Sequence, residues 1–249
     1  MRDAANGSLR PAKPYNKAQE PMPISSAEAR RFAQLPLNME ADGLLAEVDD
    51  FLIKGVPINT IYLDLLAPAA RRLGKLWEED QCDFVDVTMG LWRLQEVLYE
   101  ISARAPAPPK PLFASSRRAL FLPMPGDQHF MGPQVLGDIF TREGWDVLVM
   151  TKPQRKEVLN LLSRESFDVV GLTLSRDCPS AALRNIIRAM RSVSRNEHLS
   201  ILVGGRMINQ NPAIVAEVGA DGTGADARAA LKLAERLVQS AEVRAQTLR

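Results

Sequence analysis

His129 and Asp127 are the two residues of this sequence whose types and spacing point most clearly to chemistry. A neutral imidazole is a good ligand for a transition metal. A metal-bound histidine usually donates its other ring proton to a carboxylate, which fixes the tautomer and raises the basicity of the ring. Asp127 lies two residues before His129 and is a candidate for that carboxylate. A histidine taken alone is more often a loop residue with a satisfied local hydrogen bond, so its surroundings must distinguish the two interpretations.

The elements around this pair have the pattern of an α/β domain. Short apolar runs predict strands at 119–124, 146–150, 168–174, 199–203 and 220–222, and they alternate with helices predicted at 132–143, 154–164, 179–192, 211–218 and 225–241. This alternation predicts a Rossmann-like (flavodoxin-like), doubly wound parallel sheet of five strands. In such an open sheet, ligands bind outside the carboxyl ends of the strands.

Four loops are expected at that edge, one after each of strands one, three, four and five. Their candidate binding residues are Asp127, His129 and Gly132, then Thr173 and Ser175, then Gly204 and Gly205, and finally Gly224. A glycine has no Cβ, so a ligand can lie against its backbone. Taken singly, the glycine pair would more often be a plain turn and the threonine a strand-end hydroxyl.

The residues before this domain predict a small bundle of four helices. Helices are expected at about 26–35 and 40–54, from Pro57 onward with a kink at Pro68, and at about 83–104. In the last of these, apolar residues recur every three or four positions, the spacing of a bundle seam. We therefore predict a helical bundle at 24–105 and an α/β domain at 117–241. Residues 106–116 would be a proline-rich linker, 1–23 a disordered tail and 242–249 a C-terminal tail.

Bulk properties narrow the functional classes. The formal net charge of the 249 residues is +1, which gives no argument for a nucleic-acid surface. The two cysteines are far apart in sequence, which suits a reducing cytosol. No apolar run is long enough for a membrane span, and the first residues lack the apolar segment of a signal peptide. We expect a cytoplasmic protein without direct contact to nucleic acid or membrane.

The loop motifs resemble the cobalamin-binding domain family. Its signature is Asp-x-His-x-x-Gly, then Ser-x-Leu, then Gly-Gly, after strands one, three and four. Residues 127–132 and 204–205 match in full, whereas Thr173 replaces the serine and Ser175 the leucine. The resemblance covers about 117–241, and the preceding helices match the family's usual cap. It implies cobalamin bound base-off, with His129 as the lower cobalt ligand and the nucleotide tail at the sheet edge. It also implies that the cap, with Trp77, offers apolar surface to the corrin.

Three subfamilies remain open. Light-responsive repressors of the CarH type carry a DNA-binding domain, for which the first 23 residues leave no room, and have Glu-His where this chain has Val87-Thr88. Corrinoid shuttle proteins of methyltransferase systems share both domains. The strongest resemblance is to the AerR/PpaA type, cobalamin-binding antirepressors of photosynthesis gene regulation. It rests on residues 62–74, 76–80, 83–88, 94–95 and 144–146.

The antirepressor resemblance implies a sensor and not an enzyme. Cobalamin occupancy, including a light-exposed form of the cofactor, would change how the protein binds a transcriptional repressor. The alternative is a corrinoid methyl carrier. A third possibility is a degenerate site in a protein that binds partners without the cofactor.

Overall fold

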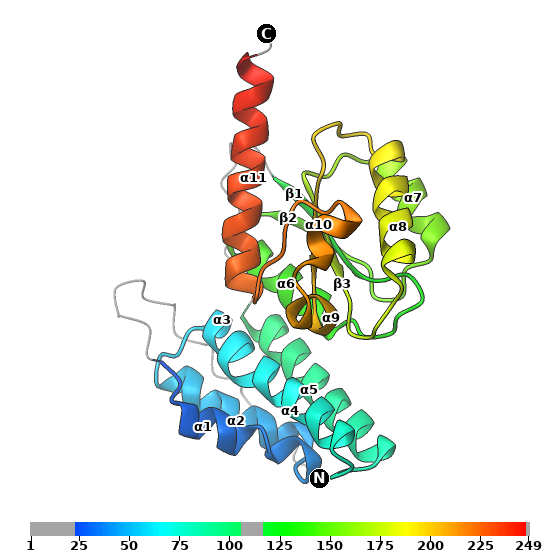
Figure 1. The fold of residues 1–249 in the computed structure, drawn as a ribbon. Helices are drawn as coiled ribbons and strands as arrows, with labels where there is room; N and C mark the ends of the chain where they lie inside the picture. The colour runs from blue at the N-terminus through cyan, green and yellow to red at the C-terminus, as the bar shows by residue number, and fades with distance from the viewer. Residues whose placement is uncertain (1–22, 106–116, 248–249) are drawn as a thin grey trace, which may run out of the picture. The chain divides into compact units, whose positions relative to one another are not determined.

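The computed structural model describes residues 23–105 and 117–247, with side chains described up to Val243. They form two compact units, a helical unit before Pro106 and an α/β unit after it (Figure 1). The predicted linker at 106–116 and nearly all of the predicted disordered tail at 1–23 lie outside the described residues.

The helical unit contains the helices expected from the sequence. It differs from the expectation in a short 3-10 helix after the first helix and in a π-helical segment within the third. Helix α1 (Ser26–Phe32) begins with a capping box formed by Ser25 and Glu28. It is followed by the short 3-10 helix η1 (Leu35–Leu37), by α2 (Ala41–Ile53) and by α5 (Phe84–Arg104). The predicted third helix is one helical run that consists of α3 (Ile58–Thr60), η2 (Ile61–Leu66) and α4 (Ala67–Glu78).

Segment η2 is a π-helix, where a kink at Pro68 was predicted. The N–H of Ala67 donates to the carbonyl of Tyr62, five residues back. Pro68 then occupies the first turn of α4, where its missing N–H and fixed φ are tolerated. The wider π turn therefore accommodates the proline without ending the helix.

Apolar side chains of all these helices fill the core of the helical unit. The largest fully buried ones are Phe32, Leu44, Ile61, Tyr62, Leu65, Leu66, Leu73 and Leu94. Gly90 brings α5 close to α4, because a Cβ there would lie 2.9 Å from a methyl carbon of Leu73. Arg93 fixes η1 to α5 by donating from Nη1 to the Pro36 carbonyl at 2.9 Å.

The α/β unit is a parallel sheet of four strands in the order β2-β1-β3-β4. The strands are β1 (Arg118–Pro123), β2 (Asp146–Val149), β3 (Val169–Thr173) and β4 (Ser200–Gly204). The helices between them are α6 (Met131–Arg142), α7 (Arg155–Arg164) and α8 (Ser180–Val193). The Rossmann-like class is thus confirmed, and the chain reverses its direction of winding between β1 and β3.

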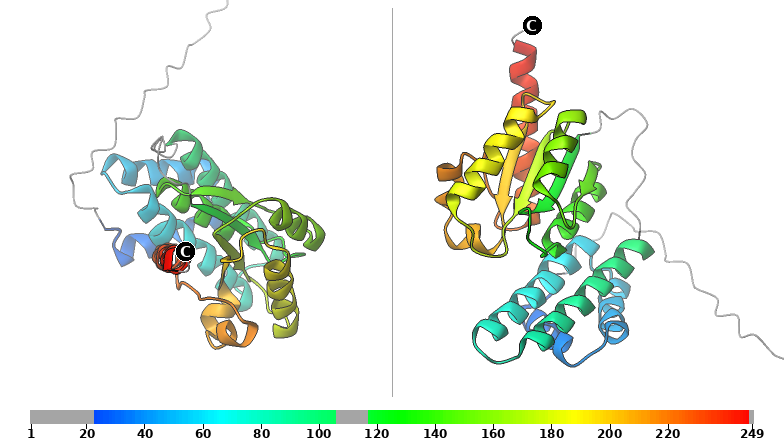
Figure 2. Two further views of the ribbon diagram at one scale, coloured as in Figure 1. Left: turned by 90° about the horizontal axis from the view of Figure 1, so that it is seen from above. Right: turned by 90° about the vertical axis from the view of Figure 1, so that its right-hand side faces the viewer.

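Helices cover both faces of this sheet. In the right-hand view of Figure 2, α7 and α8 lie in front of the sheet and α11 (Ala227–Thr247) lies behind it. The α8 face buries Leu120, Leu122, Val170, Leu172, Ile201 and Val203. The α6 and α11 face buries Ala119, Phe121, Val169, Leu202, Phe140 and Trp145. Side chains of one strand alternate between the faces, as expected for a sheet covered on both sides.

The prediction of a fifth strand was wrong. Residues 220–222 make a single isolated bridge, between Gly222 and Leu202 of β4. The carboxylate of Asp221 accepts the N–H of Ile201 at 2.6 Å and so takes the place of a backbone partner. This side-chain contact interrupts the ladder, because strand pairing needs the backbone carbonyl at that position.

Two helix predictions after β4 also needed correction. The predicted helix at 211–218 is replaced by two short ones, α9 (Arg206–Gln210) and α10 (Ile214–Val218). Helix α11 continues to Thr247, so residues 242–247 are helical and do not belong to the predicted C-terminal tail. Within the described residues, no helix combines the length and hydrophobicity required to cross a bilayer.

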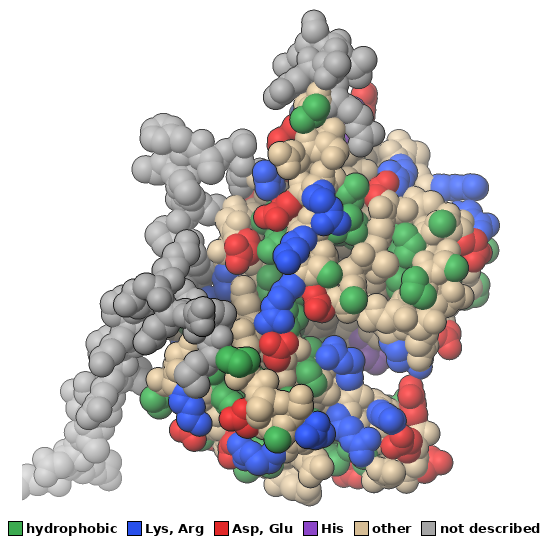
Figure 3. Space-filling view, turned by 60° about the vertical axis from the view of Figure 1, so that its left-hand side comes forward, with side chains coloured by type: hydrophobic (Ala, Val, Ile, Leu, Met, Phe, Trp, Pro, Cys, Tyr) green, Lys and Arg blue, Asp and Glu red, His purple; other side chains and the backbone are tan. Residues whose placement is uncertain are grey.

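Charges of both signs are mixed over the surface. Figure 3 shows Lys and Arg side chains interspersed with Asp and Glu on the face drawn. The most regular basic feature is a row on α11, where the exposed Arg228, Lys232 and Arg236 follow one another at four-residue spacing. Residues four apart share one helix face.

Candidate ligand site at the carboxyl edge of the sheet

A tight turn after β1 holds the first part of the site. Gly126 has a φ of +91°, which favours glycine, and the N–H of Asp127 donates to the Met124 carbonyl at 2.8 Å. The turn buries Asp127, which is 7% exposed, at the point where the chain leaves the sheet. Since α6 begins at Met131, residues 127–130 are held between the strand and the helix.

Asp127 contacts His129 through the geometry expected of a metal-ligating histidine. Nδ1 of His129 lies 2.5 Å from Oδ1 of Asp127, and the backbone N–H of His129 donates to the same oxygen at 3.2 Å. An ionised carboxylate only accepts, so Nδ1 donates and Nε2 keeps its lone pair. The imidazole is half exposed. This arrangement orients one ring nitrogen as a potential ligand.

The electrostatics of Asp127 favour the ionised carboxylate that this role requires. Burial alone would raise the pKa of Asp127. The hydrogen bonds from the ring and backbone of His129, together with the positive charge of Arg176, outweigh burial and hold the pKa of Asp127 below its usual value. Nε of Arg176 lies 3.9 Å from Oδ1 of Asp127.

The ends of β3 and β4 form the second part of the site. Thr173 and Gly204 are paired in register as the last residues of their strands. The hydroxyl of Thr173 is buried and has no hydrogen-bond partner within the described residues. A Cβ added to Gly204 would meet no atom within 4 Å, and one added to Gly132 would meet only Thr173, at 3.7 Å. An unmet hydroxyl beside open backbone is the arrangement expected of a cradle for a ligand.

The other two predicted glycines have a structural reason. Gly205 has a φ of +99°, and a Cβ there would lie 2.5 Å from the carbonyl oxygen of Leu174. A Cβ on Gly224 would lie 2.4 Å from the backbone nitrogen of Ala230 in α11. Both glycines therefore allow close backbone approach at the edge, whereas the space beside Gly204 is not explained by packing.

The loop after β3 contributes polar groups around the mouth of the site. Ser175 is half-buried, and its carbonyl accepts from Nε of Arg206 at 3.1 Å. The thiol of Cys178 has a raised pKa because of burial and the nearby carboxylates of Asp177 and Asp127. It is therefore a neutral thiol at neutral pH, which is a poor metal ligand.

Sequence reasoning missed Thr223 at the same edge. Its Oγ1 is a further buried hydroxyl without a partner. Thr223 directly follows Gly222, whose carbonyl accepts the N–H of Val203 at 3.0 Å. The residue precedes the predicted Gly224, but a hydroxyl in a Gly-Thr-Gly segment is not by itself a distinctive signal.

Trp77 belongs to the helical unit. It lies on α4 and is 51% exposed, whereas the neighbouring Leu73 and Leu76 are buried. Other exposed apolar side chains follow on α5, where Val85, Trp92 and Tyr99 recur every seven residues. The structure thus groups the eight predicted residues of the α/β unit at one sheet edge and places the ninth in the other unit.

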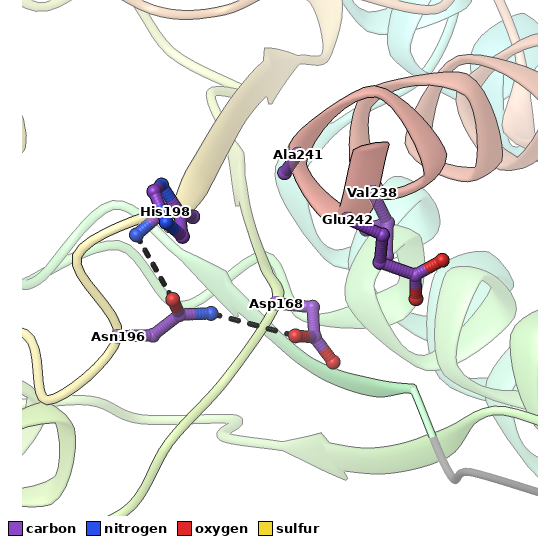
Figure 4. Close-up of a pocket in the computed structure, with 6 residues that line it drawn as sticks. All are labelled: Asp168, Asn196, His198, Val238, Ala241 and Glu242. Atoms are coloured by element: carbon purple, nitrogen blue, oxygen red, sulfur yellow. Dashed lines mark hydrogen bonds between the residues drawn. The ribbon is translucent and has the colours of Figure 1, made fainter. Parts of the chain in front are cut away.

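The opposite edge of the sheet has a small pocket with satisfied polar groups. Figure 4 shows its lining by Asp168, Asn196, His198, Val238, Ala241 and Glu242. Asp168 already accepts the N–H of Arg118 at 2.8 Å, and Asn196 accepts the N–H of His198 at 2.9 Å. Unlike the carboxyl edge, this pocket presents polar groups that are used by the fold.

The helical unit matches a known protein family. Residues 28–101 match the model of the B12 binding domain family. The helical unit is therefore similar to the B12 binding domain family over most of its length. The resemblance to cobalamin-binding proteins is therefore confirmed from the part of the chain that carries none of the sheet motifs. Binding of cobalamin or a related corrinoid is supported by this match.

Two kinds of relative accompany the B12 binding domain match. An uncharacterized 20.5 kDa protein of the bchF-crtJ intergenic region of Rhodobacter capsulatus is 24% identical over 173 residues, which cover 70% of this chain and 89% of that protein. The structure of the Methanosarcina barkeri monomethylamine corrinoid protein superposes with a TM-score of 0.65 at 15% identity, covering 82% of this chain and 95% of that one. A cobalamin-binding protein of Desulfitobacterium hafniense gives a TM-score of 0.45 at 15% identity, covering 85% and 98%.

Proposed function

We propose that this chain is a cobalamin-binding sensor that holds the cofactor base-off with His129 on the cobalt, and that it modulates a transcriptional repressor as an antirepressor. The observation that carries the cofactor proposal is the open edge of the sheet. There the unpartnered hydroxyl of Thr173 and the bare backbone of Gly204 adjoin the hydrogen-bonded pair of Asp127 and His129.

Each residue of that edge has a part in holding the cofactor. His129 offers Nε2 to the metal, and Asp127 fixes the ring through Nδ1. Gly204 and Thr173 accommodate the displaced nucleotide tail, while Gly132 leaves room at the start of α6. Bound cobalamin would supply a cobalt centre, and the chain would supply the imidazole of His129 as a ligand to it. In the helical unit, Trp77 is exposed and offers apolar surface.

The regulatory part of the proposal rests on the Rhodobacter capsulatus relative. That protein is encoded within a region of photosynthesis genes, which agrees with the motifs that resemble AerR/PpaA-type antirepressors. A ligand shifts a regulatory equilibrium only through different affinities for its two states. Accordingly, the repressor should bind the cobalamin-loaded and the free protein with different affinities.

The alternative function is a corrinoid methyl carrier in a methyltransferase system. It is consistent with the fold shared with the monomethylamine corrinoid protein. The two proposals differ in their partners, because a carrier needs a methyl donor and an acceptor enzyme, whereas the sensor needs only a repressor. Methylation of the reduced, loaded protein by a methyl donor, followed by transfer of that methyl group to the substrate of an acceptor enzyme with return of the reduced form, would favour the carrier.

The cofactor proposal is tested by loading the full chain with hydroxocobalamin and passing it through gel filtration. We expect the colour to elute with the protein and the visible spectrum to show histidine ligation. His129→Ala should lose that spectrum and bind more weakly, yet keep the fold, because the variant gives up one side-chain hydrogen bond to the buried Asp127, which costs about 1–3 kcal/mol.

The matched control is His198→Ala, which removes the other histidine at the opposite sheet edge. It should bind with the wild-type spectrum. Colourless wild-type protein after loading in light and in darkness would refute cobalamin binding. An unchanged spectrum in His129→Ala would refute the assignment of the lower ligand.

A further inference from the structure

Helix α5 has a second apolar face, which the helical unit does not bury. The face that packs into the unit carries Val87, Gly90, Leu94, Val97, Leu98 and Ile101. On the opposite side lie Val85, Trp92 and Tyr99, which are 64%, 52% and 71% exposed. Seven residues make nearly two α-helical turns, so these three side chains form one line along the helix. We call Val85, Trp92 and Tyr99 the α5 stripe.

The composition and spacing of the α5 stripe are those of an interface between helices. Single exposed apolar residues are ordinary, whereas several on one face mark an interaction surface. Trp and Tyr are among the residues that most often carry the binding energy of an interface. Apolar side chains repeated at seven-residue spacing are the pattern by which one helix packs lengthwise against another. The stripe therefore fits a helical occupant.

Acidic side chains accompany the stripe on one flank. At 100° per residue, Glu96 and Glu100 lie to one side of Trp92, and the uncharged Thr88 and Gln95 lie to the other. The acidic excess extends over the whole unit, because residues 23–105 contain fourteen Asp and Glu against eight Lys and Arg. That segment has a formal charge of −6, although the charge of the complete chain is +1.

The basic side chains on the same flank are already paired with acids of the unit. Arg93 forms an ion pair with Glu40. Nη1 of Arg104 lies 3.4 Å from a carboxylate oxygen of Asp49, and its Nε lies 3.5 Å from one of Glu100. These two cations are matched within the unit, so the flank as a whole remains acidic.

This charge distinguishes between two candidate occupants. A second copy of the chain would pack its α5 antiparallel with Trp92 opposite Trp92, because Val85 and Tyr99 are evenly spaced about that residue. Such a two-fold interface brings the same flank of both copies together. The acidic flanks would then repel each other, whereas a helix with basic flanks would be attracted.

We propose that the α5 stripe is a docking surface for an amphipathic helix with basic flanks, supplied by the repressor that this chain modulates. The inference rests on the regulatory part of the proposed function and not on the cofactor. The apolar side of the incoming helix covers Trp92 and its neighbours, and its Lys and Arg side chains lie beside Glu96 and Glu100. Cations held in this way are withheld from DNA phosphates, on which DNA binding depends.

The experiment titrates the full chain with a labelled synthetic helical peptide, about five turns long, that has Leu on one face and Lys and Arg on the other. The comparison peptide has Glu at the basic positions. Wild type should bind only the basic peptide, and more weakly as salt rises. Trp92→Gln should weaken this binding about tenfold or more. Glu96→Gln combined with Glu100→Gln should weaken it about two- to fivefold and reduce its salt dependence.

The matched control is Ile53→Gln, which removes an 83% exposed apolar side chain of α2 and should bind the peptide as wild type does. Trp92→Gln should unfold at the wild-type midpoint and retain hydroxocobalamin, because Trp92 is a surface residue. In a mobility-shift assay it should also lose the influence of the wild-type chain on the repressor.

Three results would overturn the inference. The first is equal binding of the basic and acidic peptides. The second is loss of hydroxocobalamin by Trp92→Gln with unchanged peptide binding, which would assign the stripe to the cofactor. The third is a wild-type dimer that Trp92→Gln converts to a monomer in sedimentation, which would assign it to self-association. If the peptide binds as expected but the wild-type chain leaves the repressor unaffected, the proposed regulatory function fails and the docking surface for a basic helix stands.

Discussion

Gly204 and Gly205 are adjacent in sequence but differ in why each is a glycine. Gly205 has φ +99° and ψ −177°, a region that essentially only glycine adopts, and its position leaves no room for a Cβ. Gly204 has ordinary strand geometry with open space where a side chain would point. Gly205 is therefore needed by the fold, whereas Gly204 leaves space that a ligand can fill.

Substitution should separate these two roles. Gly205→Ala should lower the free energy of unfolding by about 2–4 kcal/mol in a denaturant titration, because strain and a backbone clash add. Gly204→Val should leave that free energy within about 0.5 kcal/mol of wild type and abolish retention of hydroxocobalamin. Tight binding by a folded Gly204→Val protein would show that the nucleotide tail runs elsewhere.

The sequence predicted most of the residues at this edge because their motifs are local. The spacing between Asp127 and His129 lets one turn bring the two side chains together, and the structure has that contact. Thr223 could not be predicted, since its significance comes from an unmet hydrogen bond and not from its neighbours in sequence. A missing partner is visible only once the whole edge is built.

At the scale of elements, periodicity predicted helices better than short strands. Residues 58–78 were expected to be helical and are, but the π turn was not foreseen, because apolar spacing does not report hydrogen-bond register. The prediction of a fifth strand was wrong because the carboxylate of Asp221 accepts the hydrogen bond from the N–H of Ile201. A side chain that replaces a backbone acceptor leaves no trace in the hydrophobic pattern.

The position of Pro68 gives an element-scale prediction. A proline inside an α-helix costs about 3 kcal/mol, but Pro68 lies in the first turn after the π segment. Pro68→Ala should therefore change the free energy of unfolding by less than about 1 kcal/mol, as measured by urea unfolding. A gain near 3 kcal/mol would mean that the proline strains the helix after all. Ala67→Pro is the contrasting variant, because it removes the N–H that bonds to Tyr62 and should destabilise strongly.

At the scale of the whole molecule, charge gives no support to direct DNA binding. The net charge is +1, and basic and acidic side chains are mixed on the face in Figure 3. Strong binding to DNA needs several phosphate contacts from clustered basic residues. In a mobility-shift assay at physiological salt, we expect no shift of promoter DNA by this chain alone. Adding the cobalamin-loaded chain should change the shift produced by the repressor.

The row of Arg228, Lys232 and Arg236 supplies the control for this assay. If the chain shifted DNA by itself, replacing all three by glutamine should remove the shift and identify α11 as the contact. A sequence-specific shift by the chain alone would contradict the antirepressor proposal. If the chain left the repressor's shift unchanged both with and without cobalamin, that result would also contradict the antirepressor proposal and would favour the methyl carrier.

The π turn at 61–66 also has a meaning for how such a chain can change by insertion and deletion. A turn closed by a bond to the fifth residue back holds one residue more than an α-helical turn does. Removing a single codon within it would restore α-helical bonding, and because the wide turn alone holds the extra residue, the helix that follows would keep nearly its present rotation about its axis. Leu73 would still be buried and Trp77 would still be exposed. A one-residue change at this turn is therefore tolerated without changing which side of α4 is buried.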